Sequence, residues 1–452
     1  MNWNPAYALL LLTATLVTYS GGLILNTLKE KGLNTYRRPC LIICLIINLG
    51  ILCFFKYLVM FVAYLNKALS ILNISELSIS RDIILPVGIS FFTLQSIGYL
   101  IDVYREDIPA EKSFTTYALF VSFFPQLVAG PIERSRNLLS QLKEPKRFSY
   151  RFFQKGLLWI IYGLMVKMVI ADNLSVFVDA VYSDPSTYEG WYIVAATFAF
   201  SLQIYCDFYG YSIIAKGSAY LLGIELMSNF ESPYYSGSVK EFWRRWHISL
   251  STWFRDYLYI PLGGNKKGRI RKNINLIIVF LISGLWHGAS MSFVFWGFLN
   301  GLYQVIANIR DRIGLKLKGG SDLFCNRIIK TTGTFILITF SWIPFRAGTG
   351  AETRRIISHM IFALDNYDII NLKDIIGMWD LLPAKMAAGA LLGVLILGIV
   401  DYLKYHKKQV VDKILEQSLW FRYIVYILLI LFILNCGCYG SANAGQFIYF
   451  QF

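Results

Sequence analysis

Two histidines stand out in this largely apolar chain, because each lies in a segment whose residue types could perform acid–base chemistry. His247 lies in Glu241–Asn265, EFWRRWHISLSTWFRDYLYIPLGGN, and His287 lies forty residues later in Ser283–Ser290, SGLWHGAS. The whole sequence holds only four histidines. A histidine inside a membrane is costly unless it pairs, faces water or does chemistry. The two segments are therefore the first candidates for a functional site.

His287 is the better candidate for a general base, a group that takes a proton from a hydroxyl. Burial disfavours the charged form of a histidine, and a neutral imidazole can accept a proton. Gly284 and Gly288 flank His287, and glycine lets backbone or substrate approach closely. The alternative is a histidine that only packs among apolar side chains, which is the commoner role of a lone histidine on an apolar face.

The segment around His247 is too polar to span lipid and too aromatic for an ordinary loop. One interpretation is an amphipathic helix at the membrane surface, with rings at headgroup depth and arginines reaching water. If the segment is one helix, Trp243, His247 and Ser251 share a face at i, i+4 spacing. Pro261 and the glycines that follow it then end the helix.

Composition predicts a polytopic membrane protein of the all-α class. Of 452 residues, 56% are hydrophobic and 16% are charged, whereas soluble domains carry about 45–50% apolar and about 25% charged residues. The apolar residues form blocks, several of them close to the roughly 20 residues that a helix needs to cross a hydrocarbon core. We expect about ten to twelve helices, some short or re-entrant, in a single domain over residues 1–452. Trp191–Phe208 and Gly210–Gly223 count as two of these blocks.

The net charge of +15 is distributed as the positive-inside rule expects, in loops between apolar blocks, so nucleic-acid binding is not expected. The basic loop Lys29–Arg38 predicts an N-terminus outside the cytoplasmic membrane, and Lys404–Lys413 predicts a C-terminus outside as well. Asp172–Gly190 holds four acids and no lysine or arginine, which indicates an extracytoplasmic loop. The basic loop Arg134–Lys155 stays cytoplasmic only if Thr115–Ala129 is re-entrant or otherwise does not cross.

The seven cysteines give no support for a metal site or a disulfide framework. They lack Cys-x-x-Cys spacing and matching histidines. We therefore expect no metal site. We expect no cofactor either.

Five segments together resemble the membrane-bound O-acyltransferase family, and in particular its bacterial branch, which includes the alginate O-acetylation membrane protein. They are RRWHISLSTWFRDYLYIPLGGN, SGLWHGA, LPVGISFFTLQSIGYLIDVYR, FFPQLVAGPIER and the terminal FIYFQF. The resemblance covers most of Leu85–Phe345 and the extreme C-terminus.

The resemblance implies helices around a central funnel, with an acyl thioester approaching from the cytoplasm and an acceptor hydroxyl from outside. It gives the role of the family's buried invariant histidine to His287 and a second polar position to His247, which would orient the donor or stabilise developing charge. Asn300 stands where relatives often carry histidine, and Ile213 stands where they often carry an acid. The candidate substrate-binding residues are Trp243, Arg244, Trp246, Ser251, Asp207, Trp286 and Asn300. For Asp207 the alternative is a helix cap or a structural ion pair.

The leading hypothesis is an O-acetyltransferase that moves an acetyl group from cytoplasmic acetyl-CoA across the cytoplasmic membrane to an exported or cell-wall polysaccharide. A separate extracytoplasmic SGNH-type acetyltransferase is the expected partner. General electrostatics could attract the donor's phosphates to basic residues, here Lys240, Arg244, Arg245, Lys266 and Lys267. One alternative is D-alanylation of teichoic acid from a carrier-protein thioester. Another is a transporter or flippase without covalent chemistry, since broken helices and midplane polar groups also serve transport.

Overall fold

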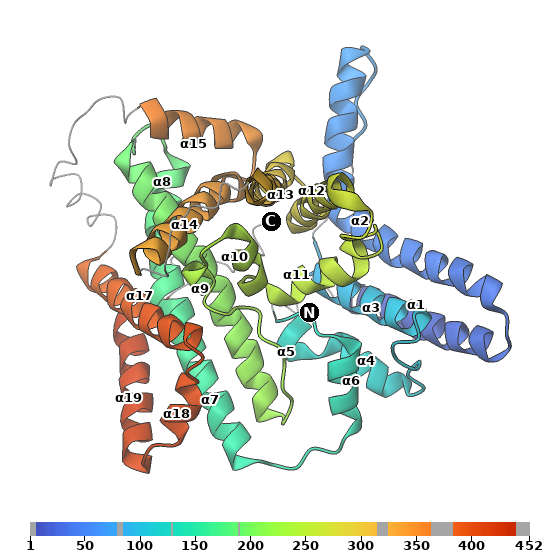
Figure 1. The fold of residues 1–452 in the computed structure, drawn as a ribbon, viewed down its shortest axis with the longest axis horizontal. Coiled ribbons are helices and arrows are strands. Elements are labelled where there is room, and N and C mark those ends of the chain that lie inside the picture. The colour runs from blue at the N-terminus through green and yellow to red at the C-terminus, as the bar shows by residue number, and fades with distance from the viewer. Residues whose placement is uncertain are drawn as a thin grey trace. The chain divides into compact units, whose positions relative to one another are not determined.

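The computed structural model is all-α, which confirms the predicted fold class (Figure 1). It describes residues 6–78, 85–127, 130–188, 190–313, 324–362 and 383–439. These residues form eighteen α-helices, two π-helices and one 3-10 helix, and none of them forms a strand. The helices outnumber the ten to twelve expected from apolar blocks, because many are short and polar.

Seven helical segments among the described residues are long and apolar enough to cross a membrane, as a multi-pass membrane protein requires. They are Tyr7–Glu30, Asn34–Ile71, Tyr150–Ser183, Trp191–Leu221, Asn326–Ala347, Ala384–Tyr405 and Leu419–Cys436. The side of the membrane on which each terminus lies stays a prediction. The terminal FIYFQF motif lies outside the described residues.

The chain divides into two compact units, residues 1–147 with 224–226, and residues 148–223 with 227–452. Whether they act as the single domain expected from the sequence stays a prediction. Both histidines lie in the second unit.

In the first unit, three long helices pack together and three short ones follow. The hydroxyl of Tyr117 in the fourth helix donates a hydrogen bond of 2.7 Å to Thr18 Oγ1 in the first. The six helices are α1 (Ala6–Glu30), α2 (Asn34–Ile71), α3 (Ile89–Tyr104), α4 (Phe114–Ser122), α5 (Phe124–Leu127) and α6 (Ser135–Lys143).

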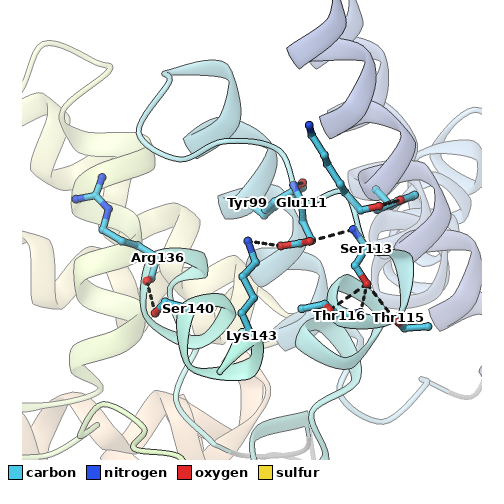
Figure 2. Close-up of polar contacts among 10 residues, drawn as sticks. Tyr99, Glu111, Ser113, Thr115, Thr116, Arg136, Ser140 and Lys143 are labelled. Carbon is cyan, nitrogen blue, oxygen red and sulfur yellow. Dashed lines mark hydrogen bonds and ion pairs between the residues drawn. The ribbon is translucent and has the colours of Figure 1, made fainter. Parts of the chain in front are cut away.

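A buried carboxylate fixes the connection between α3 and α4 (Figure 2). Glu111 accepts a hydrogen bond of 2.9 Å from the backbone N–H of Ser113 and forms an ion pair of 2.6 Å with Lys143 of α6. The backbone N–H of Glu111 donates to the hydroxyl of Tyr99, in α3. Ser113 then caps α4, since its hydroxyl accepts from the backbone N–H of Thr116.

The apolar block Thr115–Ala129 folds as two short helices rather than one span. Helix α4 has nine residues and α5 has four, far fewer than the roughly 20 that cross a bilayer. This agrees with the expectation that the block does not cross. Residues 128 and 129 lie outside the described part of the chain.

In the second unit, a long helical run packs along a 31-residue helix, α9 (Trp191–Leu221). The run consists of α7 (Tyr150–Leu164), the π-helix η1 (Met165–Ala171) and α8 (Asp172–Ser183), and Figure 1 shows α7 and α9 side by side. Glycines make the close approach possible: a Cβ added to Gly217 would lie 2.7 Å from the carbonyl oxygen of Gly156.

Two expectations in this region are wrong. Trp191–Phe208 and Gly210–Gly223 are one helix to Leu221 rather than two. Gly210 is tolerated inside this helix because the backbone of the neighbouring helix fills the space where a side chain would lie. The segment Asp172–Gly190 is not a loop throughout, since its first twelve residues form α8. The first of its acids, Asp172, is buried and lies 2.5 Å from Lys167 Nζ.

The rest of the second unit carries the two histidine segments and the C-terminal helices. The histidine segments contain η2 (Pro233–Tyr235), α10 (Val239–Arg245), α11 (Ile248–Phe254), the π-helix η3 (Arg255–Tyr259), α12 (Gly268–His287) and α13 (Met291–Ile313). They are followed by α14 (Phe324–Ala347), α15 (Gly350–Phe362), α17 (Ala384–Tyr405), α18 (Val410–Leu415) and α19 (Leu419–Cys436).

Candidate active site

The fold brings His247 and His287 together although forty residues separate them in the sequence. Their ring centroids are 6.4 Å apart. Both side chains are buried, with 1% of His247 and 6% of His287 exposed. Two imidazoles are thus enclosed by protein within one small region of the second unit.

His247 reaches this position because the helix ends just before it. The residue has a left-handed backbone, with φ 42° and ψ 54°, between α10 and α11. A left-handed conformation costs a residue with a side chain about 1–2 kcal/mol. The continuous helix considered for this segment is therefore wrong, and so is the face that Trp243, His247 and Ser251 would have shared.

A hydrogen-bonded network holds this turn in place against α9. The carbonyl oxygen of Asn229 accepts from the backbone N–H of Ile248 at 2.9 Å, and its side-chain oxygen accepts from the hydroxyl of Ser249 at 2.6 Å. The amide nitrogen of Asn229 donates to Ser212 of α9 at 3.1 Å. Since all three side chains are buried, these bonds keep the strained turn fixed.

His287 is positioned by the close packing of α12 against α13, the apolar hairpin expected from the sequence. A Cβ on Gly284 would collide with the carbonyl oxygen of Phe293, and a Cβ on Gly297 would collide with that of Phe280. A Cβ on Gly288 would meet the ring of Phe293. The glycines near His287 therefore allow α12 and α13 to pack closely against each other.

Aromatic rings enclose both imidazoles. The ring centroid of His287 lies 4.9 Å from that of Trp286, 5.1 Å from that of Trp296 and 5.4 Å from that of Phe345. His247 lies edge-on to Phe208 of α9 at 4.7 Å. Both buried imidazoles are thus packed against aromatic rings.

Four of the predicted substrate-binding residues belong to this aromatic cluster. Trp286 precedes His287, and Trp246 packs on Trp342 with centroids 5.1 Å apart. Trp243 donates from its indole N–H to the side-chain oxygen of Asn300 at 3.2 Å. Asn300 in turn donates to the carbonyl oxygen of Trp296 at 2.9 Å. These residues shape the histidine site, while contact with a substrate stays a prediction.

The other three predicted residues are not among the aromatic rings that pack around the histidines. Arg244 is exposed, and the partly exposed Ser251 donates from its hydroxyl to the carbonyl oxygen of Trp246 at 3.3 Å. Asp207 is buried and lies 2.5 Å from Lys167 Nζ, which also pairs with Asp172. Asp207 thus forms the structural ion pair that was the alternative to a substrate-binding role. A contact between Asp207 and a substrate stays a prediction.

Sequence reasoning missed several residues of the cluster, namely Phe208, Trp296, Trp342 and Phe345. The last two lie one turn apart on α14, a spacing that also describes an ordinary buried helix face. Asn229, which holds the His247 turn, gave no signal because it lies in a loop far from either histidine motif.

Burial sets the electrostatic environment of His247. His247 lies outside the seven candidate spans, and burial lowers the pKa of its imidazole to about 3. A group with so low a pKa is neutral near pH 7 and is a weak base, although it can still donate or accept a hydrogen bond. An uncharged His247 can therefore form a hydrogen bond with a reactant, while the catalytic roles of both histidines stay predictions.

The described residues contain no group of three or more His, Cys, Asp or Glu that could hold a metal ion. The two imidazoles of the cluster can transfer protons and form hydrogen bonds.

Comparison with known proteins places this site in a family. A family model described as MBOAT, membrane-bound O-acyltransferase family, matches residues 107–313, which include both histidines. The chain is 36% identical over 350 residues to a protein of Pseudomonas syringae pv. tomato named "Probable alginate O-acetylase AlgI". That match covers 76% of this chain and 64% of the relative, so the chain spans less than two thirds of the relative's length.

Two further relatives carry related names. A peptidoglycan O-acetyltransferase of Helicobacter pylori is 34% identical over 385 residues, covering 79% of this chain and 71% of the relative. A teichoic acid D-alanyltransferase of Bacillus subtilis is 27% identical over 274 residues, covering 57% and 67% of the two chains. With a paired-histidine site inside the matched region and this degree of identity, the chain belongs to the membrane-bound O-acyltransferase family.

Proposed function

We propose that the protein transfers an acetyl group from cytoplasmic acetyl-CoA across the membrane for O-acetylation of an exported or cell-wall polysaccharide. The observation that carries the proposal is the buried pair of His247 and His287, with ring centroids 6.4 Å apart, within the matched region. Relatives named for O-acetylation of alginate and peptidoglycan support a polysaccharide acceptor.

In the proposed reaction, His287 acts as the general base. Its neutral imidazole takes the proton of a hydroxyl while the hydroxyl oxygen attacks the thioester carbonyl of the donor. The new C–O bond forms, the C–S bond breaks, and the proton passes from the imidazolium to the departing thiolate. The hydroxyl belongs either to the polysaccharide or to a partner that relays the acetyl group. A positioned base contributes roughly 10²–10⁴-fold to such a step.

His247 and the aromatic enclosure have supporting roles in this proposal. A neutral His247 donates a hydrogen bond to the thioester carbonyl, whose oxygen gains negative charge as the bond forms. The surrounding tryptophans limit water, which would otherwise hydrolyse the thioester. Approximation of the two substrates supplies much of the remaining acceleration.

The test is to incubate the purified protein with radiolabelled acetyl-CoA and to follow thioester loss and the label on protein, partner or glycan. Wild type is compared with His287→Ala and with His359→Ala, whose histidine lies on α15 outside the cluster. We expect turnover in wild type and His359→Ala and a loss of about 100-fold or more in His287→Ala. Equal turnover in all three proteins would make His287 structural.

D-alanylation of teichoic acid is the second candidate, favoured by the Bacillus subtilis relative. It ranks lower because identity to that relative is 27%, against 36% and 34% for the two O-acetylation relatives. If wild type fails to use acetyl-CoA in the presence of partner and glycan, a D-alanyl carrier-protein thioester is the next donor to supply. Failure of both donors would favour transport without covalent chemistry.

The proposed partner is an extracytoplasmic SGNH-type acetyltransferase that receives or places the acetyl group. Co-purification of the two proteins, with label moving from acetyl-CoA to the partner only when both are present, would support relay. Label on the glycan without the partner would support direct transfer.

A further inference from the structure

Two guanidinium groups from separate helices stack on one tyrosine ring in the second unit. Arg245 ends α10, Arg327 is the fourth residue of α14, and Tyr405 ends α17. Each guanidinium carbon lies 4.5 Å from the centroid of the Tyr405 ring. Cation–π attraction explains why each arginine adopts this position, but it also brings two positive charges close together.

Carboxylates only partly balance this charge. Arg245 donates from Nε to Glu241 at 3.0 Å and from a terminal nitrogen to the carbonyl oxygen of Glu231 at 3.0 Å. Arg327 is exposed and forms no ion pair with any carboxylate of the described residues. A guanidinium carries five N–H donors, so most of the donors of this pair have no partner among the described residues.

The position of Arg327 makes the imbalance larger. It lies in the first turn of α14, which contains no acidic residue, and a helix N-terminus favours negative rather than positive charge. Lys330 lies one turn further along the same helix. On the facing segment, a Cβ added to Gly237 would lie 3.8 Å from the Cβ of Lys330. The carboxylate oxygen Oε2 of Glu241 would lie equally close to that Cβ, so the charge that lacks a counterpart among the described residues is that of Arg327.

We propose that Arg245, Arg327 and Tyr405 form a binding site for a phosphate ester. The planar fork of a guanidinium matches phosphate oxygens two at a time, and two forks held on one rigid ring are already oriented for them. Holding both forks on Tyr405 lowers the entropy lost when the anion binds.

The placement of the site suggests two sources of this phosphate. Arg327 and Tyr405 lie at the ends of the candidate spans Asn326–Ala347 and Ala384–Tyr405, where aromatic rings and basic residues meet lipid headgroups. Ile329, two residues after Arg327 on α14, is 66% exposed, as a lipid-facing side chain would be. The other source is the donor, since Arg245 lies two residues before His247. Only this second source rests on the proposed function.

The experiment measures binding by the full-length protein, with phosphatidylglycerol and free coenzyme A as the two probes. Arg327→Gln is compared with wild type and with Arg354→Gln, which removes an exposed arginine of α15. We expect Arg327→Gln to weaken the binding of one probe about tenfold or more, as the loss of a charge-assisted contact does. Arg354→Gln should leave that affinity unchanged. Which probe is weakened identifies the source of the phosphate.

Three results would overturn the proposal: wild type binds neither probe, Arg327→Gln binds both as tightly as wild type, or Arg354→Gln loses as much affinity as Arg327→Gln. Arg327→Lys keeps the positive charge without the planar guanidinium and should show an intermediate loss of affinity. This variant keeps the proposal testable if Arg327→Gln misfolds. A wild type that binds phosphatidylglycerol but transfers no acetyl group would refute the proposed function and leave this site intact.

Discussion

The side-chain oxygen of Asn300 on α13 accepts a hydrogen bond of 3.2 Å from the indole N–H of Trp243 on α10. This bond joins the helix that leads into the His247 turn to the helix that packs beside His287. Asn300 is fully buried and also donates to the carbonyl oxygen of Trp296. Its amide therefore ties the two histidine segments together.

Asn300→Ala should destabilise the protein by about 1–3 kcal/mol, because a buried indole N–H loses its acceptor. Thermal unfolding in detergent measures this change. Trp243→Phe removes the donor, so the double variant should be less destabilised than the sum of the single variants. If the destabilisations of the two single variants add up to that of the double variant, Trp243 and Asn300 are not energetically coupled.

The positive φ of His247 predicts an unusual order of stability among its variants. Both His247→Ala and His247→Gly lose the imidazole, but only glycine adopts the left-handed conformation without strain. We expect His247→Gly to be more stable than His247→Ala by about 1 kcal/mol. Ile248→Gly, in the first turn of α11, is the control, since there glycine should be less stable than alanine. Equal stability of the two His247 variants would indicate that the turn relaxes.

The lowered pKa of His247 predicts a loss of stability in mild acid. Its pKa is about 3 in the folded protein and near 6.5 when unfolded, so the unfolded state binds more protons between these values. Stability therefore rises with pH across this window and falls as pH drops below 6.5. Wild type should lose about 2 kcal/mol more than His247→Gln between pH 7 and pH 5. Parallel stability curves for the two proteins would contradict the buried neutral state.

The contact between α12 and α13 predicts that Gly284→Ala is strongly destabilising. The added methyl group would collide with the carbonyl oxygen of Phe293, and such overpacking costs typically 1–3 kcal/mol or more. Gly333→Ala on α14 is the matched control, since nothing lies within 4 Å of its added Cβ. It should be neutral or gain up to about 1 kcal/mol from helix propensity. Unfolding temperatures of the two variants test the difference.

The buried contacts of Lys167 predict that its loss is more harmful than the loss of one carboxylate. Lys167→Met would leave Asp172 and Asp207 buried without their shared cation, which costs about 3–5 kcal/mol. Asp207→Asn leaves Lys167 paired with Asp172 and should cost less. The folded fraction in detergent and the unfolding temperature report both effects. A larger loss of stability in Asp207→Asn than in Lys167→Met would contradict this prediction.

The sequence predicted the parts of the site that depend on residue type, and missed those that depend on tertiary contacts. The choice of His247 and His287 as candidates and the α12–α13 hairpin followed from histidines and glycines in apolar surroundings, and the structure brings the two histidines together. The His247 turn could not be predicted, because a left-handed histidine is stable only where Asn229 and Ser249 hold it. Likewise Gly210, normally a weak point in a helix, is tolerated in α9 because the neighbouring backbone packs against it.

The π-helix η1 sets the rotational phase of α8 about its own axis. Each residue turns an α-helix by about 100°, and a π segment contains an additional residue in its turn. The faces of α7 and α8 are therefore offset, and this offset aims the buried Val178 and Val181 at their neighbours. Deleting one residue between Met165 and Ala171 would rotate every later side chain of α8 by about a quarter turn or more. Insertions and deletions in this short segment are thus constrained by geometry as well as by the ion pairs of Lys167.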